Sequence, residues 1–380
     1  MSLTRRPALS PFQLYLAIVA AGLAVFAFFL PFGVTTDMVV TVWSFLPLGL
    51  CLALTFGLLV AQRGRVHPAV VGVLAIASAA ALLFELNRLT DVAWGFWLTL
   101  GLCWVLAWLF AERLTAYVRA GRTGGRLALV AIPLMLGAAV LLVWEAVTRG
   151  ADVPPVIMPP PSAIWVRLTE NIPVLAADFV QTFVKSVLSG YVMGCGIGFV
   201  VAIAIDRSPF LKRGLLPLGN FVSALPMVGI APIMVLWFGF DWPSKAAVVV
   251  VMTFFPMLVN TVAGLNAAGR LERDMMRTYA ASYWQTLIKL RLPAAAPFIF
   301  NALKINSTLA LIGAIVAEFF GTPIVGMGFR ISTAVGRMDI GLVWAEIAVA
   351  AVSGTAFYAV VALIERGVTF WHPSVRGGRT

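Results

Sequence analysis

The sequence predicts an all-α, polytopic membrane protein with about ten transmembrane helices. Of its 380 residues, 61% are apolar and only 11% are charged, and the mean hydropathy is +0.97. Soluble domains are closer to half apolar and a quarter charged. Apolar runs of about 20 residues, the length that crosses a bilayer as a helix, recur along the chain. Basic residues gather in the short loops between these runs, as they do in membrane proteins.

The apolar runs set the predicted spans. Helices are favoured over strands because each run is far longer than an ordinary strand. The ten predicted spans lie at about 12–32, 39–61, 67–84, 92–111, 127–147, 182–205, 213–238, 246–264, 296–317 and 342–364.

The basic residues predict the topology. With the N-terminus in the cytoplasm, most Lys and Arg residues fall in loops on the cytoplasmic side, which is the usual bias for the inner (plasma) membrane of a bacterium. An even number of spans then places both termini in the cytoplasm. The net charge of +11 is explained by these loops, so nucleic acid is not an expected partner and membrane lipid is.

The chain divides into two predicted regions. Residues 1–120 form a four-helix membrane extension, and residues 121–380 hold the remaining six spans after a basic, glycine-rich linker at 120–126. Residues 150–162 contain five prolines and are expected to form an extended strap on the external side, because proline fixes φ and removes a donor. Ser162 is predicted to cap a short helix at 163–172.

The sequence shows no pattern typical of a metal site or a catalytic site. Cys51, Cys103 and Cys195 lie inside apolar runs without metal-ligand spacing, and the two histidines, His67 and His372, lie beside prolines in loops. The sequence contains no GxxxxGK[ST] pattern for binding ATP phosphates. We therefore expect neither an enzyme nor a bound cofactor.

An amphipathic segment interrupts the second region at 265–295. Apolar residues recur with helical spacing from Leu271 to Ile288, and charged residues occupy the opposite face. Such a helix lies either in the membrane interface or in a groove of a cytoplasmic partner, and the pattern alone favours neither.

The stretch from Asp274 to Pro293 resembles the EAA loop of type I ABC importer permeases, the membrane subunits of binding-protein-dependent importers. Asp274 stands at the acidic position, Ala280 at the position of the family's glycine, and Pro293 at its proline. The Ser282-Tyr283-Trp284-Gln285 stretch matches the Ser-x-Trp-Gln of the branch that imports nitrate, sulfonates, taurine and pyrimidine precursors of thiamine. Met275, Met276 and Ala280 depart from the family pattern. Segments at 158–165, 224–239 and 317–329 resemble the same branch.

The resemblance implies a permease core that imports a small organic solute, such as a thiamine pyrimidine precursor, a riboflavin-like molecule, a sulfonate, taurine or nitrate. The implied partners are two ABC ATPase subunits that bind the ATP, a periplasmic or lipid-anchored substrate-binding protein, and a second permease copy in a homodimer. The residues that this resemblance places at the contact with the ATPase are Asp274, Tyr279, Ala280, Ser282, Tyr283, Trp284, Gln285, Leu292 and Pro293.

Small or weakly polar residues in the spans are candidates for lining the solute pathway: Asn220, Ser223, Met227, Asn260, Asn306 and Ser307. The alternative for each Asn or Ser is a hydrogen bond to a neighbouring helix. Near the external ends, Arg330 and Arg337 are expected to pair with Glu318, with Asp339 or with the binding protein, unless they are simply solvated. The alternative function is a secondary transporter, which the lack of ionisable residues near the span centres disfavours.

Overall fold

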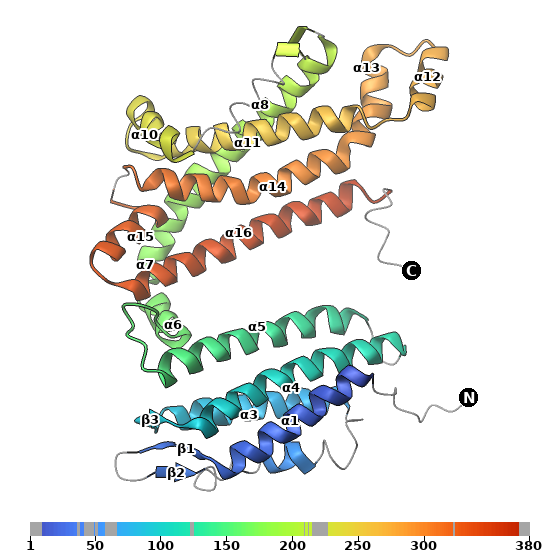
Figure 1. The fold of residues 1–380 in the computed structure, drawn as a ribbon. Helices are drawn as coiled ribbons and strands as arrows, with labels where there is room; N and C mark the ends of the chain where they lie inside the picture. Colours follow the sequence, from blue (N-terminus) through green and yellow to red (C-terminus); the bar gives the residue numbers. More distant parts are fainter. Residues whose placement is uncertain are drawn as a thin grey trace. The chain divides into compact units, whose positions relative to one another are not determined.

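The computed structural model describes residues 10–35, 39–41, 49, 52–57, 67–121, 125–208, 210–211, 213–214, 227–321 and 324–371. The chain forms two compact units, Met1–Ala163 and Ile164–Thr380. Within the described ranges, eight helices are long and apolar enough to cross a membrane, and Figure 1 shows how helices dominate both units. The all-α, polytopic fold class is confirmed.

Four long helices build the first unit: α1 (Pro11–Phe29), α3 (Pro68–Leu86), α4 (Trp94–Arg119) and α5 (Gly125–Gly150). Ser10 and His67 cap α1 and α3 with their side chains, and a proline follows each cap, where its missing N–H costs nothing. Helix α4 packs against the other three. Helix α5, which was predicted to belong to the second region, thus lies in the same compact unit as α1, α3 and α4. The predicted region boundary at residue 120 stays a prediction.

A small antiparallel sheet in the first unit was not predicted. Strand β1 (Pro31–Val34) lies between β2 (Val39–Thr41) and β3 (Asp91–Val92). The predicted span 39–61 is therefore wrong at its start, where β-branched residues favour a strand. Residues 52–57 are helical, and most of the other residues of that span lie outside the described ranges.

The second unit is a bundle of long helices. The chain runs through α6 (Pro161–Glu170), which begins at the unit boundary, then α7 (Ile172–Phe179), the π-helix η2 (Val180–Val187) and α8 (Leu188–Arg207). It continues through α10 (Met227–Phe238), α11 (Trp242–Leu265), α12 (Arg270–Thr278), α13 (Tyr283–Thr286), the π-helix η3 (Leu287–Arg291) and α14 (Leu292–Glu318). Two helices complete it: α15 (Met327–Gly336) and α16 (Ile340–Val368).

Helix α11 lies at the centre of this bundle, packed against α8 and α14, and α14 also packs against α16 (Figure 1). Gly190, Gly194 and Gly198 form the face of α8 that meets α11, and a Cβ at Gly194 would overlap the Thr253 hydroxyl. Small residues allow this close approach, which supplies the van der Waals packing between membrane helices.

Two local predictions have different outcomes. Residues 151–160 contain no helix, as the prolines predict, but the predicted strap 150–162 is wrong at both ends, because Gly150 ends α5 and Pro161 begins α6. Ser162, however, is not the cap of the following helix, because α6 already begins at Pro161. Its backbone N–H and its hydroxyl instead donate to the Glu145 carboxylate at 2.9 and 2.6 Å. The predicted span 213–238 is described only in part, since residues 215–226 lie outside the described ranges.

Candidate functional site

The segment that joins α11 to α14, residues 266–291, projects from the bundle at the end opposite α15 (Figure 1). We call it the α12–α13 segment. The predicted continuous helix from Leu271 to Ile288 is wrong, because the backbone turns between α12 and α13. Ala280 has a left-handed φ of 52°, which ends α12. Ser282 then starts α13 with a capping box, in which its hydroxyl accepts from the Gln285 N–H and the Gln285 side chain accepts from the Ser282 N–H.

One carboxylate anchors this segment to the bundle. Asp206, near the end of α8, accepts two hydrogen bonds from the Arg291 guanidinium at 2.6 and 2.7 Å. The Tyr283 hydroxyl donates to the same carboxylate at 2.9 Å, and Arg291 also donates to the Leu265 carbonyl at 2.9 Å. Charge-assisted, bidentate contacts are the strong kind. They fix the start of α14 to the ends of both α8 and α11.

Packing supports the same anchor. Leu287 is buried in a small core with Leu265 and Ala295, and the Arg207 guanidinium lies 5.0 Å from the centre of the Tyr283 ring. Tyr283 is half-buried within the chain. Its ring and hydroxyl contact Arg207 and Asp206, so less of the ring is left exposed to a partner.

An apolar patch remains exposed on the segment. Its members are each more than half exposed: Leu271, Met275, Tyr279, Trp284 and Ile288. Leu271 and Met275 lie in α12, Tyr279 follows it, Trp284 lies in α13, and Ile288 lies in η3. An exposed group of large apolar side chains indicates an interaction surface.

The other residues predicted for the ATPase contact lie in the segment and in the first turn of α14. Asp274 is exposed and lies 3.8 Å from Arg277, Ala280, Ser282 and Gln285 are exposed at the turn, and Leu292 and Pro293 are half-buried in the first turn of α14. Seven of the nine predicted residues therefore lie in the α12–α13 segment, and their contact with an ATPase stays a prediction.

The predicted pathway residues fall into two groups. Asn220 and Ser223 lie outside the described residues, as does the side chain of Met227. Among the others, the Asn306 amide donates to the Thr253 carbonyl at 2.7 Å and to the Cys195 sulfur at 3.2 Å. Asn260 and Ser307 donate to carbonyls of their own helices. Asn306 thus links α14 to α8 and α11, and its pathway role stays a prediction.

A polar cluster at the other end of the second unit escaped the sequence analysis. Helix α15 begins at Met327, and the N–H groups at its start are met by side chains from three other elements. Asp178 of α7 accepts from the Gly326 N–H at 2.6 Å, Thr182 of η2 from the Met327 N–H at 2.8 Å, and Glu318 of α14 from the Gly328 N–H at 2.7 Å. Anionic groups at a helix N-terminus also interact favourably with its dipole.

Two cations, one partly and one almost fully buried, balance these carboxylates. Arg330 donates to Asp178 at 2.7 Å, and this hydrogen bond raises the pKa of the guanidinium. The predicted pairing of Arg330 with Glu318 or Asp339 is therefore wrong: Asp339 lies 3.8 Å from Arg167 instead. The Lys245 ammonium, almost fully buried, donates to the carbonyls of Phe240 and Gly321. We call Asp178, Thr182, Lys245, Glu318, Arg330 and Glu346 of α16 the polar cluster.

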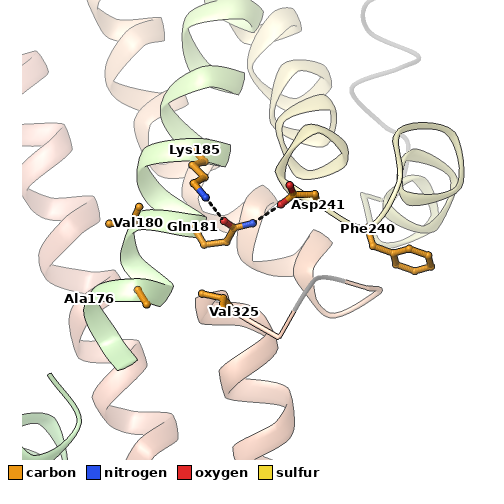
Figure 2. Close-up of a pocket in the computed structure, with 8 residues that line it drawn as sticks. Ala176, Val180, Gln181, Lys185, Phe240, Asp241 and Val325 are labelled. Carbon is orange, nitrogen blue, oxygen red and sulfur yellow. Dashed lines mark hydrogen bonds between the residues drawn. The ribbon is translucent and has the colours of Figure 1, made fainter. Parts of the chain in front are cut away.

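A pocket of about 930 Å³ lies beside the polar cluster. Figure 2 shows Gln181 between Lys185 and Asp241: its carbonyl accepts from the Lys185 ammonium at 3.0 Å, and its amide donates to Asp241 at 2.8 Å. Asp241 also accepts from the Trp242 N–H, which lowers the pKa of its carboxyl, as does the bond from Gln181. Apolar side chains form the rest of the wall: Ala176, Ala177, Val180, Phe240 and Val325.

Residues 194–370, which include the α12–α13 segment and α15, match the family model of the binding-protein-dependent transport system inner membrane component. This part of the chain belongs to the ABC importer permease family. The resemblance seen in the sequence is confirmed, whereas the assignment of Asp274 to Pro293 to the family's EAA loop stays a prediction. The protein is thus a multi-pass membrane protein, and its second unit resembles ABC importer permeases.

Three relatives show the breadth of the match. The chain is 29% identical over 235 residues to a probable ABC transporter permease protein of Haemophilus influenzae, covering 62% of this chain and 95% of that protein. It is 29% identical over 247 residues to the riboflavin transport system permease protein RibX of Chloroflexus aurantiacus (64% and 90%). It is 28% identical over 243 residues to the formylaminopyrimidine transport permease protein ThiX of Halalkalibacterium halodurans (63% and 95%). About a third of this permease lies outside each match.

Proposed function

We propose that this chain is the transmembrane permease subunit of an ABC importer, which moves a small organic solute into the cytoplasm using ATP hydrolysis in a partner subunit. The observation that supports this proposal is the exposed apolar patch on the anchored α12–α13 segment. It lies within the matched family region, and its large side chains fit a groove on a partner. The chain itself needs no cofactor, because the ATPase subunits bind the ATP.

The anchor suggests how force passes into the membrane. A partner that moves the α12–α13 segment pulls on Arg291 and Asp206, and therefore on α14 and α8 together. Both helices pack against α11. Closure of an ATPase pair would then shift these three helices as one body and switch the cavity between its inward-facing and outward-facing states, as alternating access requires.

The assembly follows from the same arrangement. Two ATPase subunits bind the α12–α13 segments of two permease copies in the cytoplasm of a bacterium, with both chain termini on that side of the inner membrane. The polar cluster and the pocket beside it then face outward, where a substrate-binding protein delivers the solute.

The solute is a small organic molecule. Riboflavin and formylaminopyrimidine are named for two relatives, and aliphatic sulfonates and taurine for two others. The predicted span centres carry no charged side chain, which favours a neutral or aromatic solute over a small anion that would want a basic site.

Copurification tests the proposal. A tagged chain is purified from its native membranes, and bound ABC ATPase is identified by mass spectrometry. Burying one large aromatic side chain stabilises a complex by about 1.5–3 kcal/mol, and about 1.4 kcal/mol is a factor of ten in affinity. Tyr279→Asp with Trp284→Asp should therefore abolish ATPase recovery, whereas Lys289→Ala, on an exposed polar position, should leave it intact.

Two results would contradict the proposal. Recovery of ATPase at the wild-type level with the double variant would show that the patch is not the docking surface. Solute uptake that survives ATP depletion but stops when the ion gradient is dissipated would instead identify a secondary transporter.

A further inference from the structure

Glu346 of α16 is the least satisfied member of the polar cluster. Its side chain is fully buried, and neither carboxylate oxygen meets a hydrogen-bond donor in the described part of the chain. Helix α16 packs against α7, α14 and α15. The charged groups that face Glu346 from these helices are Asp178, Glu318 and Arg330, of which two are themselves carboxylates.

Local charges do not balance if all three carboxylates are ionised. Arg330 is committed to Asp178 through its guanidinium, and Lys245 lies near Glu318. Arg330 and Lys245 thus face three carboxylates. The excess negative charge would lie on Glu346, which accepts no hydrogen bond from the described residues. Burying an unpaired charge is very costly, and a carboxyl group in such a place takes up a proton instead.

The missing hydrogen bond has the same explanation. An ionised carboxylate only accepts hydrogen bonds, so two facing carboxylates form none, whereas a protonated carboxyl group also donates one. We infer that Glu346 is a buried proton-binding site: its carboxyl group holds one proton, taken up from solvent, and donates it in a hydrogen bond to Asp178. The proton leaves two carboxylates opposite two cations, and it joins α16 to α7.

A metal cation fits the same place less well. Both oxygens of Asp178 and both of Glu318 already accept hydrogen bonds from N–H or O–H groups. Among the residues that the structure describes, no group of three or more His, Cys, Asp or Glu side chains is placed to hold a metal ion. A proton needs only the one contact between Glu346 and Asp178.

The proton-binding site controls the start of α15. Asp178, which accepts the proton's hydrogen bond, also holds the Gly326 N–H and Arg330, and Val325, one residue earlier, lines the pocket. Removing the proton places a third negative charge against Asp178 and Glu318. We expect α16 to be pushed away from α7 and the start of α15 to lose its fixed position beside the pocket.

Infrared difference spectroscopy of the purified full chain tests this site, because a protonated carboxyl group has a carbonyl band separate from those of carboxylates. Raising the pH of the wild type should remove one such band, and Glu346→Gln should lack it from the start. Glu365→Gln is the matched control on the same helix: Glu365 is paired with Lys304 at 2.7 Å, so its loss should leave the band unchanged.

Stability gives a second measurement. The Gln amide also donates to Asp178, so Glu346→Gln should keep the wild-type melting temperature at neutral pH and lose the wild type's decline at alkaline pH. A pH-sensitive band that survives in Glu346→Gln, or an alkaline decline equal to that of the wild type, would overturn the assignment. A melting temperature that depends on the choice of Na⁺ or K⁺ at constant ionic strength would also overturn it, in favour of a bound metal cation.

Discussion

Asp206 and Arg291 form a two-point ion pair between the end of α8 and the start of α14, with N–O distances of 2.6 and 2.7 Å. The two residues are 85 positions apart in the sequence, and both side chains are about nine-tenths buried. Tyr283 adds a third hydrogen bond to the same carboxylate. One carboxylate therefore joins the exposed α12–α13 segment to α8, beside the bond from Arg291 to Leu265 and the packing of Leu287.

Asp206→Ala should destabilise the protein and release the segment. Removing one partner of a buried ion pair costs about 3–5 kcal/mol, because the other charge stays buried without compensation. The expected result is a lower melting temperature, with faster proteolysis at the turn near Ala280. Asp274→Ala is the control, since the Asp274–Arg277 pair is exposed and surface pairs contribute about 0–1 kcal/mol. Equal melting temperatures for the two variants would contradict the anchor.

Position 280 should accept glycine at least as well as its native alanine. Its φ of 52° lies in the left-handed region, which costs a residue with a Cβ about 1–2 kcal/mol. We expect Ala280→Gly to keep or raise the melting temperature, and Ala280→Val to lower it, because a β-branched residue is strained further there. Ala281→Val, at a neighbouring position without positive φ, is the comparison. A valine that is harmless at both positions would show that the turn does not need this conformation.

The sequence predicts well what depends on local composition. Long apolar runs define most of the spans, and the order of residues from Asp274 to Pro293 locates the α12–α13 segment. The turn at Ala280 was missed because helical spacing of apolar residues continues through it, and the strand at Val39 was missed because it begins an apolar run. The polar cluster could not be predicted, because its residues come from six elements between Asp178 and Glu346 that meet only after folding. Its one local signal was the pair Gly326 and Gly328.

Gly326→Ala should disrupt the polar cluster. Gly326 has a φ of 143°, and a Cβ there would lie 2.8 Å from the Glu318 carboxyl group. That carboxyl group cannot move without breaking its hydrogen bonds with the Thr182 hydroxyl and the Gly328 N–H. Both strain and overpacking destabilise, typically by about 1–3 kcal/mol each. Gly336→Ala, at the other end of α15 with open space around it, should be tolerated. A larger fall in melting temperature for Gly336→Ala than for Gly326→Ala would contradict the close packing of Gly326 against Glu318.

Deleting residues 2–120 should separate two roles of the chain. The deletion removes α1, α3 and α4 and leaves α5 without the helices against which it packs, so we expect weaker membrane insertion and a lower melting temperature. The exposed patch and its anchor lie wholly in the second unit, between Asp206 and Arg291. ATPase copurification should therefore persist in the fraction that inserts correctly, measured per mole of inserted permease. Complete loss of ATPase from correctly inserted protein would show that the deleted helices are needed for the complex.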